Sequence, residues 1–278
     1  MSKPPYYGKD RPRQKPGFAR GADRTPVARP HAEAADPDGP ARIWGIHAVE
    51  AALKNERRVV LRLALTENAE RRLAEAIVAK GASVERSSPR DLDRELGADT
   101  VHQGALLVAE PLPEPSLEDL IAISVATGGP LVVLDQVTDP HNVGAILRSA
   151  AVFGAAGMIM TRRHSPPLSG ALAKTASGAL ELVPIALVGN LARTLAELEE
   201  AGVARIGLDG EADAEIGLET FGAPSAIVLG AEGKGLRRLT RELCDRLVRI
   251  GAAGSLASLN VSNAAAVALY AASRRQAE

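Results

Sequence analysis

The chain has 278 residues, 46% of them hydrophobic, and a formal net charge of −1, so it is long enough for two domains of ordinary size. Aromatic residues make up only 3%, which excludes an aromatic platform for single-stranded bases, and the one cysteine, Cys244, excludes a disulfide framework. The five histidines lack metal-ligand spacing and no apolar run approaches membrane-spanning length, so we expect a cytoplasmic protein with a reduced thiol, no metal and no membrane contact.

The N-terminal segment differs from the rest of the chain in charge. Residues 1–30 contain eight Lys or Arg and two Asp, whereas the remainder contains 25 basic and 32 acidic residues. Prolines are frequent here and large apolar residues are few, which predicts a disordered basic tail over residues 1–41. Such an arm either contacts the phosphates of a polyanion or serves only as a solubility tail, and composition leaves both readings open.

Residues 42–110 have the pattern of a small α/β domain. The pattern predicts strands over 59–65, 83–86 and 105–110 and helices over 45–55, 68–80 and 90–96. Gly81 ends the second helix, and Ser88-Pro89 begins the third. Three prolines then mark a stiff linker, which together with a further helix fills residues 111–128.

Residues 129–278 alternate between strand and helix patterns. The pattern predicts strands over 131–136, 157–161, 181–187, 203–208, 226–230 and 247–250, and helices over 142–153, 190–201, 236–244 and 258–274. This alternation predicts an α/β domain with a parallel sheet covered on both faces.

The first chemical motif spans residues 131–151, where an apolar strand turns at Asp139-Pro140 into a helix with one buried face. Gly144 lies one turn before Arg148, so the arginine would lie over a position without a side chain. This places a guanidinium near Asp139 and Asn142, at a strand-to-helix turn of the kind where α/β proteins bind ligands. An ordinary surface arginine explains the pattern equally well.

Two further polar turns follow strands in the second domain. Residues 226–236 run from a strand into three glycines around Glu232, in a spacing that matches neither a P-loop nor a dinucleotide fingerprint. Residues 250–263 crowd five Ser and Asn side chains before an alanine-rich helix, more than helix capping requires. That helix is either a dimer interface or a core contact, and Glu232 is either a site residue or a solvated turn residue.

In this order, the three motifs resemble the SpoU, or TrmH, family of RNA ribose 2′-O-methyltransferases. The motifs are 135–150 with Asn142, Gly144 and Arg148, 229–236 with Glu232, and 250–262 with Ser258, Leu259 and Asn260. Residues 42–110 resemble the ribosomal-protein-like RNA-binding domain of the branch that methylates a guanosine ribose in the peptidyl-transferase P-loop of 23S ribosomal RNA. The chain departs from the family pattern at Gly251, Ala252 and Asn263, and we expect these departures to loosen or reshape the cofactor pocket.

The resemblance implies a catalytic domain threaded into a trefoil knot, a homodimer, an RNA substrate and S-adenosylmethionine as methyl donor, without a metal. It also implies that Arg148 holds the 2′-hydroxyl, that Asn142 orients Arg148, and that Glu232 pairs with a cation or hydroxyl. Ser258 and Asn260 would shape the turn around the substrates, and the cofactor would contact Gly230, Ile250 and Leu259. The alternatives are the same reaction on a tRNA ribose, a non-catalytic RNA-binding protein on this fold, and a nucleotide-phosphate enzyme built on the glycine loop.

Overall fold

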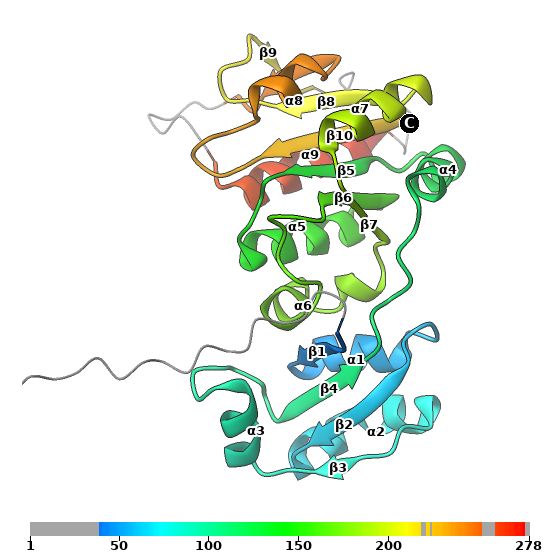
Figure 1. The fold of residues 1–278 in the computed structure, drawn as a ribbon, viewed down its shortest axis with the longest axis vertical. Helices are drawn as coiled ribbons and strands as arrows, with labels where there is room; N and C mark the ends of the chain where they lie inside the picture. Colours follow the sequence, from blue (N-terminus) through cyan, green and yellow to red (C-terminus); the bar gives the residue numbers. More distant parts are fainter. Residues whose placement is uncertain (1–38, 218–220, 223, 252–258, 276–278) are drawn as a thin grey trace, which may run out of the picture. The chain divides into compact units, whose positions relative to one another are not determined.

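A computed structural model of the chain describes residues 39–217, 221–222, 224–251 and 259–275, and residues 34–278 form one compact unit (Figure 1). Residues 1–38, which make up nearly all of the predicted tail, lie outside the described residues. The first strand begins at Ala41, inside the range assigned to that tail.

The small domain is a four-stranded sheet with three helices. Its strands are β1 (Ala41–Trp44), β2 (Val60–Leu65), β3 (Glu85–Arg86) and β4 (Ala105–Ala109), in the order β1-β4-β2-β3. Its helices are α1 (Ile46–Lys54), α2 (Glu67–Lys80) and α3 (Pro89–Leu96). The predicted helix boundaries are confirmed, because Gly81 ends α2 in the left-handed conformation and Ser88 accepts from the Asp91 N–H at the start of α3. The sequence pattern missed β1.

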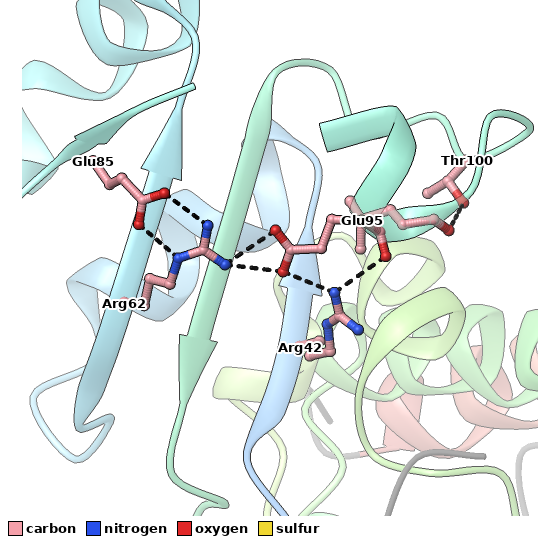
Figure 2. Close-up of polar contacts among 6 residues, drawn as sticks. Arg42, Arg62, Glu85, Glu95 and Thr100 are labelled. Atoms are coloured by element: carbon pink, nitrogen blue, oxygen red, sulfur yellow. Dashed lines mark hydrogen bonds and ion pairs between the residues drawn. The ribbon is translucent and has the colours of Figure 1, made fainter. Parts of the chain in front are cut away.

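An exposed network of ion pairs links the strands β1, β2 and β3 to the helix α3 (Figure 2). Arg62 on β2 contacts Glu85 on β3 at 2.7 Å and Glu95 on α3 at 2.9 Å, and Arg42 on β1 contacts Glu95 at 2.9 Å. The hydrogen bonds that Arg62 donates to Glu85 lower the pKa of the Glu85 carboxyl. Exposed pairs of this kind stabilise a fold by at most about 1 kcal/mol each, so the network chiefly orients the short elements.

The second domain begins with α4 (Leu117–Thr127), which the predicted helix after the linker anticipates. Its strands are β5 (Leu131–Asp135), β6 (Gly157–Thr161), β7 (Ile185–Val188), β8 (Ala204–Leu208), β9 (Ala214–Glu215), β10 (Ser225–Gly230) and β11 (Arg246–Arg249). The helices between them are α5 (Pro140–Val152), α6 (Gly170–Ala176), the 3-10 turn η1 (Ala179–Glu181), α7 (Leu191–Glu200), α8 (Arg238–Glu242) and α9 (Val261–Arg275).

These seven strands form one parallel sheet in the order β7-β6-β5-β10-β8-β11-β9. Alternate residues of β5 face opposite sides. Val132 and Leu134 pack in the cluster that includes α5 and α9, whereas Leu131 and Val133 pack in the cluster that includes α4 and α7. Both faces of the sheet are therefore buried, which confirms the α/β prediction for this domain.

Three local predictions differ from the structure. The strand predicted over 181–187 begins at Ile185, because Gly178 starts a 3-10 turn and Pro184 interrupts the strand pattern. Helix α6 is short and bounded by Gly170 and Ser177, so its periodicity is too brief to read. Cys244 lies just after α8 rather than within it.

Candidate active site at the carboxyl ends of the central strands

The ends of β5 and β10 lie side by side, since Asp135 pairs with Gly230 in the parallel register. The turns after these strands therefore emerge at the same edge of the sheet. One leads into α5 with Asn142 in its first turn, and the other is the loop that contains Glu232. Such an edge is where open α/β sheets bind ligands.

The loop after β10 folds back on its own strand. Ala231 and Gly235 exchange backbone hydrogen bonds of 3.1 and 2.8 Å, and Gly233 and Gly235 have positive φ values. A Cβ on Gly230 would lie 2.1 Å from the carbonyl carbon of Gly235, so residue 230 has no space for a side chain. Cβ atoms on Gly233 and Gly235 would meet nothing within 4 Å, so this part of the loop is open to a ligand.

A buried carboxylate anchors the far end of this loop. Asp135 is fully buried at the end of β5, and its carboxylate accepts from the Arg237 side chain at 2.6 Å and from the Arg237 N–H at 3.1 Å. Sequence reasoning did not identify this pair. Its signal is an acidic residue that ends an otherwise apolar buried strand, a position where a carboxylate requires a partner.

Residues from the three sequence motifs meet in one hydrogen-bonded cluster, which we call the amide–carboxylate cluster. Asn142 donates to Glu232 at 3.1 Å, and the Asn260 amide donates to Asn142 at 3.0 Å and to Glu232 at 3.4 Å. The Asn260 side-chain oxygen accepts from the N–H and hydroxyl of Ser262, which holds the start of α9. The Glu232 oxygens thus accept from two amides of the chain, and the cationic or hydroxyl partner expected for Glu232 stays a prediction.

Arg148 lies on an exposed part of α5 and has no hydrogen-bond or ion-pair partner among the described residues. Asn142 is engaged with Glu232 and Asn260 rather than with Arg148, and Asp139 caps the helix by accepting from the His141 N–H at 3.0 Å. The guanidinium is thus available to an external ligand and is not oriented by the residues named for it.

The remaining predicted residues occupy different environments. Ile250 is half-buried just after β11, and Leu259 is 52% exposed shortly before α9. Ser258 and Ala252 lie outside the described residues. Of the departures from the family pattern, Asn263 is exposed in the first turn of α9, and a Cβ on Gly251 would lie 2.8 Å from the Glu215 carboxylate.

Two further properties bear on the kind of site. Within the described ranges, no group of three His, Cys, Asp or Glu side chains is arranged to hold a metal ion. The helices in the same ranges are too short or too polar to cross a bilayer.

Comparison with known families gives a match in each half of the chain. The SpoU rRNA Methylase family matches residues 129–270, and a family described as RNA 2′-O ribose methyltransferase substrate binding matches residues 42–115. The relatives from Shewanella oneidensis and Ralstonia nicotianae are each 43% identical to this chain, and both are named 23S rRNA (guanosine-2′-O-)-methyltransferase RlmB. These alignments cover 84% of this chain and 97% and 94% of the two relatives.

Solved structures show the same fold. The SpoU methyltransferase AviRb from Streptomyces viridochromogenes, in complex with AdoMet, has a TM-score of 0.71 and 27% identity, covering 86% of this chain and 91% of that one. An AdoMet-bound rRNA methyltransferase from Sinorhizobium meliloti has a TM-score of 0.69 and 25% identity, covering 84% and 87%.

Proposed function

This chain belongs to the SpoU rRNA methylase family, and from this membership we propose that it methylates the 2′-oxygen of a guanosine ribose in 23S ribosomal RNA with S-adenosylmethionine as donor. The relatives that carry this activity in their name align over nearly their whole length. The observation that carries the proposal is the amide–carboxylate cluster, because three separate motifs converge in it at the ligand-binding edge of the sheet.

Arg148 acts on the ribose in this proposal. S-adenosylmethionine supplies an activated methyl group, so the protein must align the ribose and help its hydroxyl lose a proton. Arginine is protonated at neutral pH, and its planar fork suits both an oxygen that gains negative charge and an adjacent phosphate. The guanidinium is exposed and has no partner in the part of the chain that the structure describes, which suits it to these contacts.

The residues around Arg148 hold the site in shape. Asn142, Glu232 and Asn260 fix the turns after β5 and β10 and the start of α9 relative to one another. Ser258 belongs to the same proposed catalytic set. Gly230, Ile250 and Leu259 would contact the cofactor, which fits the open backbone of the glycine loop, the half-buried Ile250 and the exposed Leu259.

The domain arrangement extends the proposal. Residues 42–110 would recognise the RNA, residues 111–128 would form the linker and the first helix, and residues 129–278 would catalyse, with the C-terminal part threaded into a trefoil knot. The proposed enzyme acts in the cytoplasm and uses no metal ion.

A homodimer is supported by apolar side chains exposed on α5 and α9, namely Val152, Val267 and Tyr270. Of the alanines of α9, Ala265, Ala268 and Ala272 are buried in the core, so their side chains would not form the dimer surface.

The test is methyl transfer from radiolabelled S-adenosylmethionine to unmodified 23S rRNA and, separately, to unmodified tRNA. We expect labelled 2′-O-methylguanosine in 23S rRNA only. Label confined to tRNA would instead establish the alternative substrate, and no label with either RNA would leave a non-catalytic RNA-binding protein.

Arg148→Lys tests the assigned role, with Arg193→Lys on the exposed surface of α7 as the matched control. Loss of a transition-state contact lowers the rate by about tenfold or more, so Arg148→Lys should fall by that factor while the control stays at the wild-type rate. Equal rates in the two variants would show that Arg148 does not contact the reacting group.

A further inference from the structure

A buried ion pair joins the small domain to the catalytic domain within the compact unit of residues 34–278. Arg58 lies between α1 and β2, Glu181 ends η1, and their side chains are 2% and 3% exposed. Arg58 donates to the two Glu181 oxygens at 2.6 and 3.2 Å and to the Glu110 carbonyl at 2.9 Å. Asn55 donates to Glu181 at 2.7 Å.

Two glycines shape the surface around this pair: Gly170 begins α6, and Gly178 lies between α6 and η1. A Cβ on Gly170 would lie 2.7 Å from the Trp44 ring, and a Cβ on Gly178 would lie 2.8 Å from the Cβ of Ala51. Both glycines have positive φ values. The small domain is therefore in van der Waals contact with the backbone at the start of α6 and at the start of η1, and a side chain at either glycine would push it away.

The opposite side of α6 packs against the helix that carries the site. A Cβ on Gly144 of α5 would lie 2.8 Å from the Thr175 Cβ and 2.9 Å from the Leu172 carbonyl, and His141 bonds Thr175 at 3.2 Å. Figure 1 shows α6 between α5 and the strand β1 of the small domain. A continuous path of packed elements thus connects the small domain to the helix that carries Asn142 and Arg148.

We propose that Glu181 is a positioning residue, which with Arg58 fixes the small domain in one orientation relative to α5, so that rRNA held by the small domain reaches the site of the same subunit. Apolar contacts alone permit sliding, whereas a buried two-pronged ion pair is satisfied in only one arrangement. The role of this pair in rRNA binding rests on the proposed function.

The consequence is a strong dependence of rRNA affinity on the pair. Once rRNA is bound by the small domain, a fixed domain arrangement gives it a high effective concentration at the surface of the catalytic domain. Loosening the joint reduces that benefit, so the KM for rRNA should rise while cofactor affinity stays unchanged.

The structure supplies its own probe, because Trp44 at this interface is the one tryptophan in the chain. We would compare full-length wild type with Glu181→Gln, measuring acrylamide quenching of Trp44, Kd for S-adenosylmethionine, and KM and kcat with unmodified 23S rRNA. Asp245→Asn is the matched control, because it breaks an arginine–carboxylate pair that lies wholly within the catalytic domain.

For Glu181→Gln we expect stronger Trp44 quenching and a KM for rRNA raised by about tenfold or more, with Kd for the cofactor and kcat at saturating rRNA unchanged. The control should lower thermal stability without changing quenching or KM. Should Glu181→Gln fail to fold, Arg58→Met/Glu181→Leu replaces the pair by apolar side chains, an exchange that proteins tolerate, and should still raise KM.

An unchanged KM overturns the proposal, whether or not Trp44 becomes more exposed, because the pair would then be merely structural. A fall in kcat or in cofactor affinity equal to the rise in KM also overturns it, since the damage would then lie in the site. If wild type transfers no methyl group, the proposed function fails, whereas Trp44 quenching still reports whether Glu181 holds the interface.

Discussion

Gly230→Ala is expected to damage the site because the one added atom, the alanine Cβ, would overlap the backbone of the loop after β10. Its new Cβ would lie 2.1 Å from the Gly235 carbonyl carbon and 2.3 Å from the Leu236 nitrogen. Carbon atoms that are not bonded approach to about 3.5 Å, so the loop backbone must move by more than about 1 Å. Glu232 lies in this loop, and displacements of that size at an active site lower rates by about 100-fold.

The same substitution also strains the fold. Overpacking destabilises proteins by about 1–3 kcal/mol, and each kcal/mol lowers Tm by roughly 2–4 °C for a domain somewhat smaller than this chain. We therefore expect a fall in Tm of roughly 2–12 °C, measured by differential scanning fluorimetry, together with the loss of methyl transfer to 23S rRNA.

Gly202→Ala is the matched control for this experiment. Gly202 lies in the turn between α7 and β8, has a φ of 74°, and a Cβ there meets nothing within 4 Å. The left-handed backbone alone costs about 1–2 kcal/mol, so this variant should lose comparable stability and keep its rate per folded molecule. If Gly230→Ala loses no more methyl transfer per folded molecule than Gly202→Ala, the reasoning about the loop is refuted.

Three further outcomes follow from other parts of the structure. Burial raises the pKa of the Cys244 thiol to about 12, so iodoacetamide at about pH 8 should label it only after unfolding by guanidinium; rapid labelling of native protein would contradict this. Hydrogen bonds from Arg205 lower the pKa of Asp245, so its stabilisation is complete above the unfolded value of about 3.9 and is lost as the pH falls through the folded value. Wild type should therefore lose more Tm than Asp245→Asn from about pH 5 to about pH 2, and parallel losses would show that the pair does not matter. Ser88→Ala should lower the free energy of urea unfolding by about 1 kcal/mol and Ser87→Ala by much less, since only Ser88 caps α3; equal effects would exclude the cap.

The sequence predicts elements well where their signals are local. Ser88 and Gly81 mark helix ends by their own conformational preferences, and the apolar run before Asp139-Pro140 predicts β5 and α5. Helix α6 escapes prediction because seven residues give less than two full periods of a helix. Its first residue, Gly170, lies against Trp44, a residue far away in the chain.

The candidate site shows the same limit. The motifs identify Asn142, Glu232 and Asn260, and the parallel sheet explains why they converge. The sequence does not predict which of these residues hydrogen-bond to each other, because bonds between residues about 90 and 118 positions apart produce no local sequence pattern. The pairs Asp135–Arg237 and Arg58–Glu181 escaped sequence reasoning for this reason, although each contains a buried charge that requires a partner.

The strand order constrains how the protein is made. β10 lies between β5 and β8, yet both neighbours precede it in the chain. At synthesis rates of about 5–20 residues per second, β10 leaves the ribosome about 5–20 s after β5. β5 keeps an unpaired apolar edge throughout that interval, whereas β8 leaves the ribosome only about 20 residues before β10, so a gap between two apolar edges lasts about 1–4 s. Such edges invite pairing with other chains. The strand order therefore predicts that the nascent chain requires protection, for example by a chaperone, until β10 has been made.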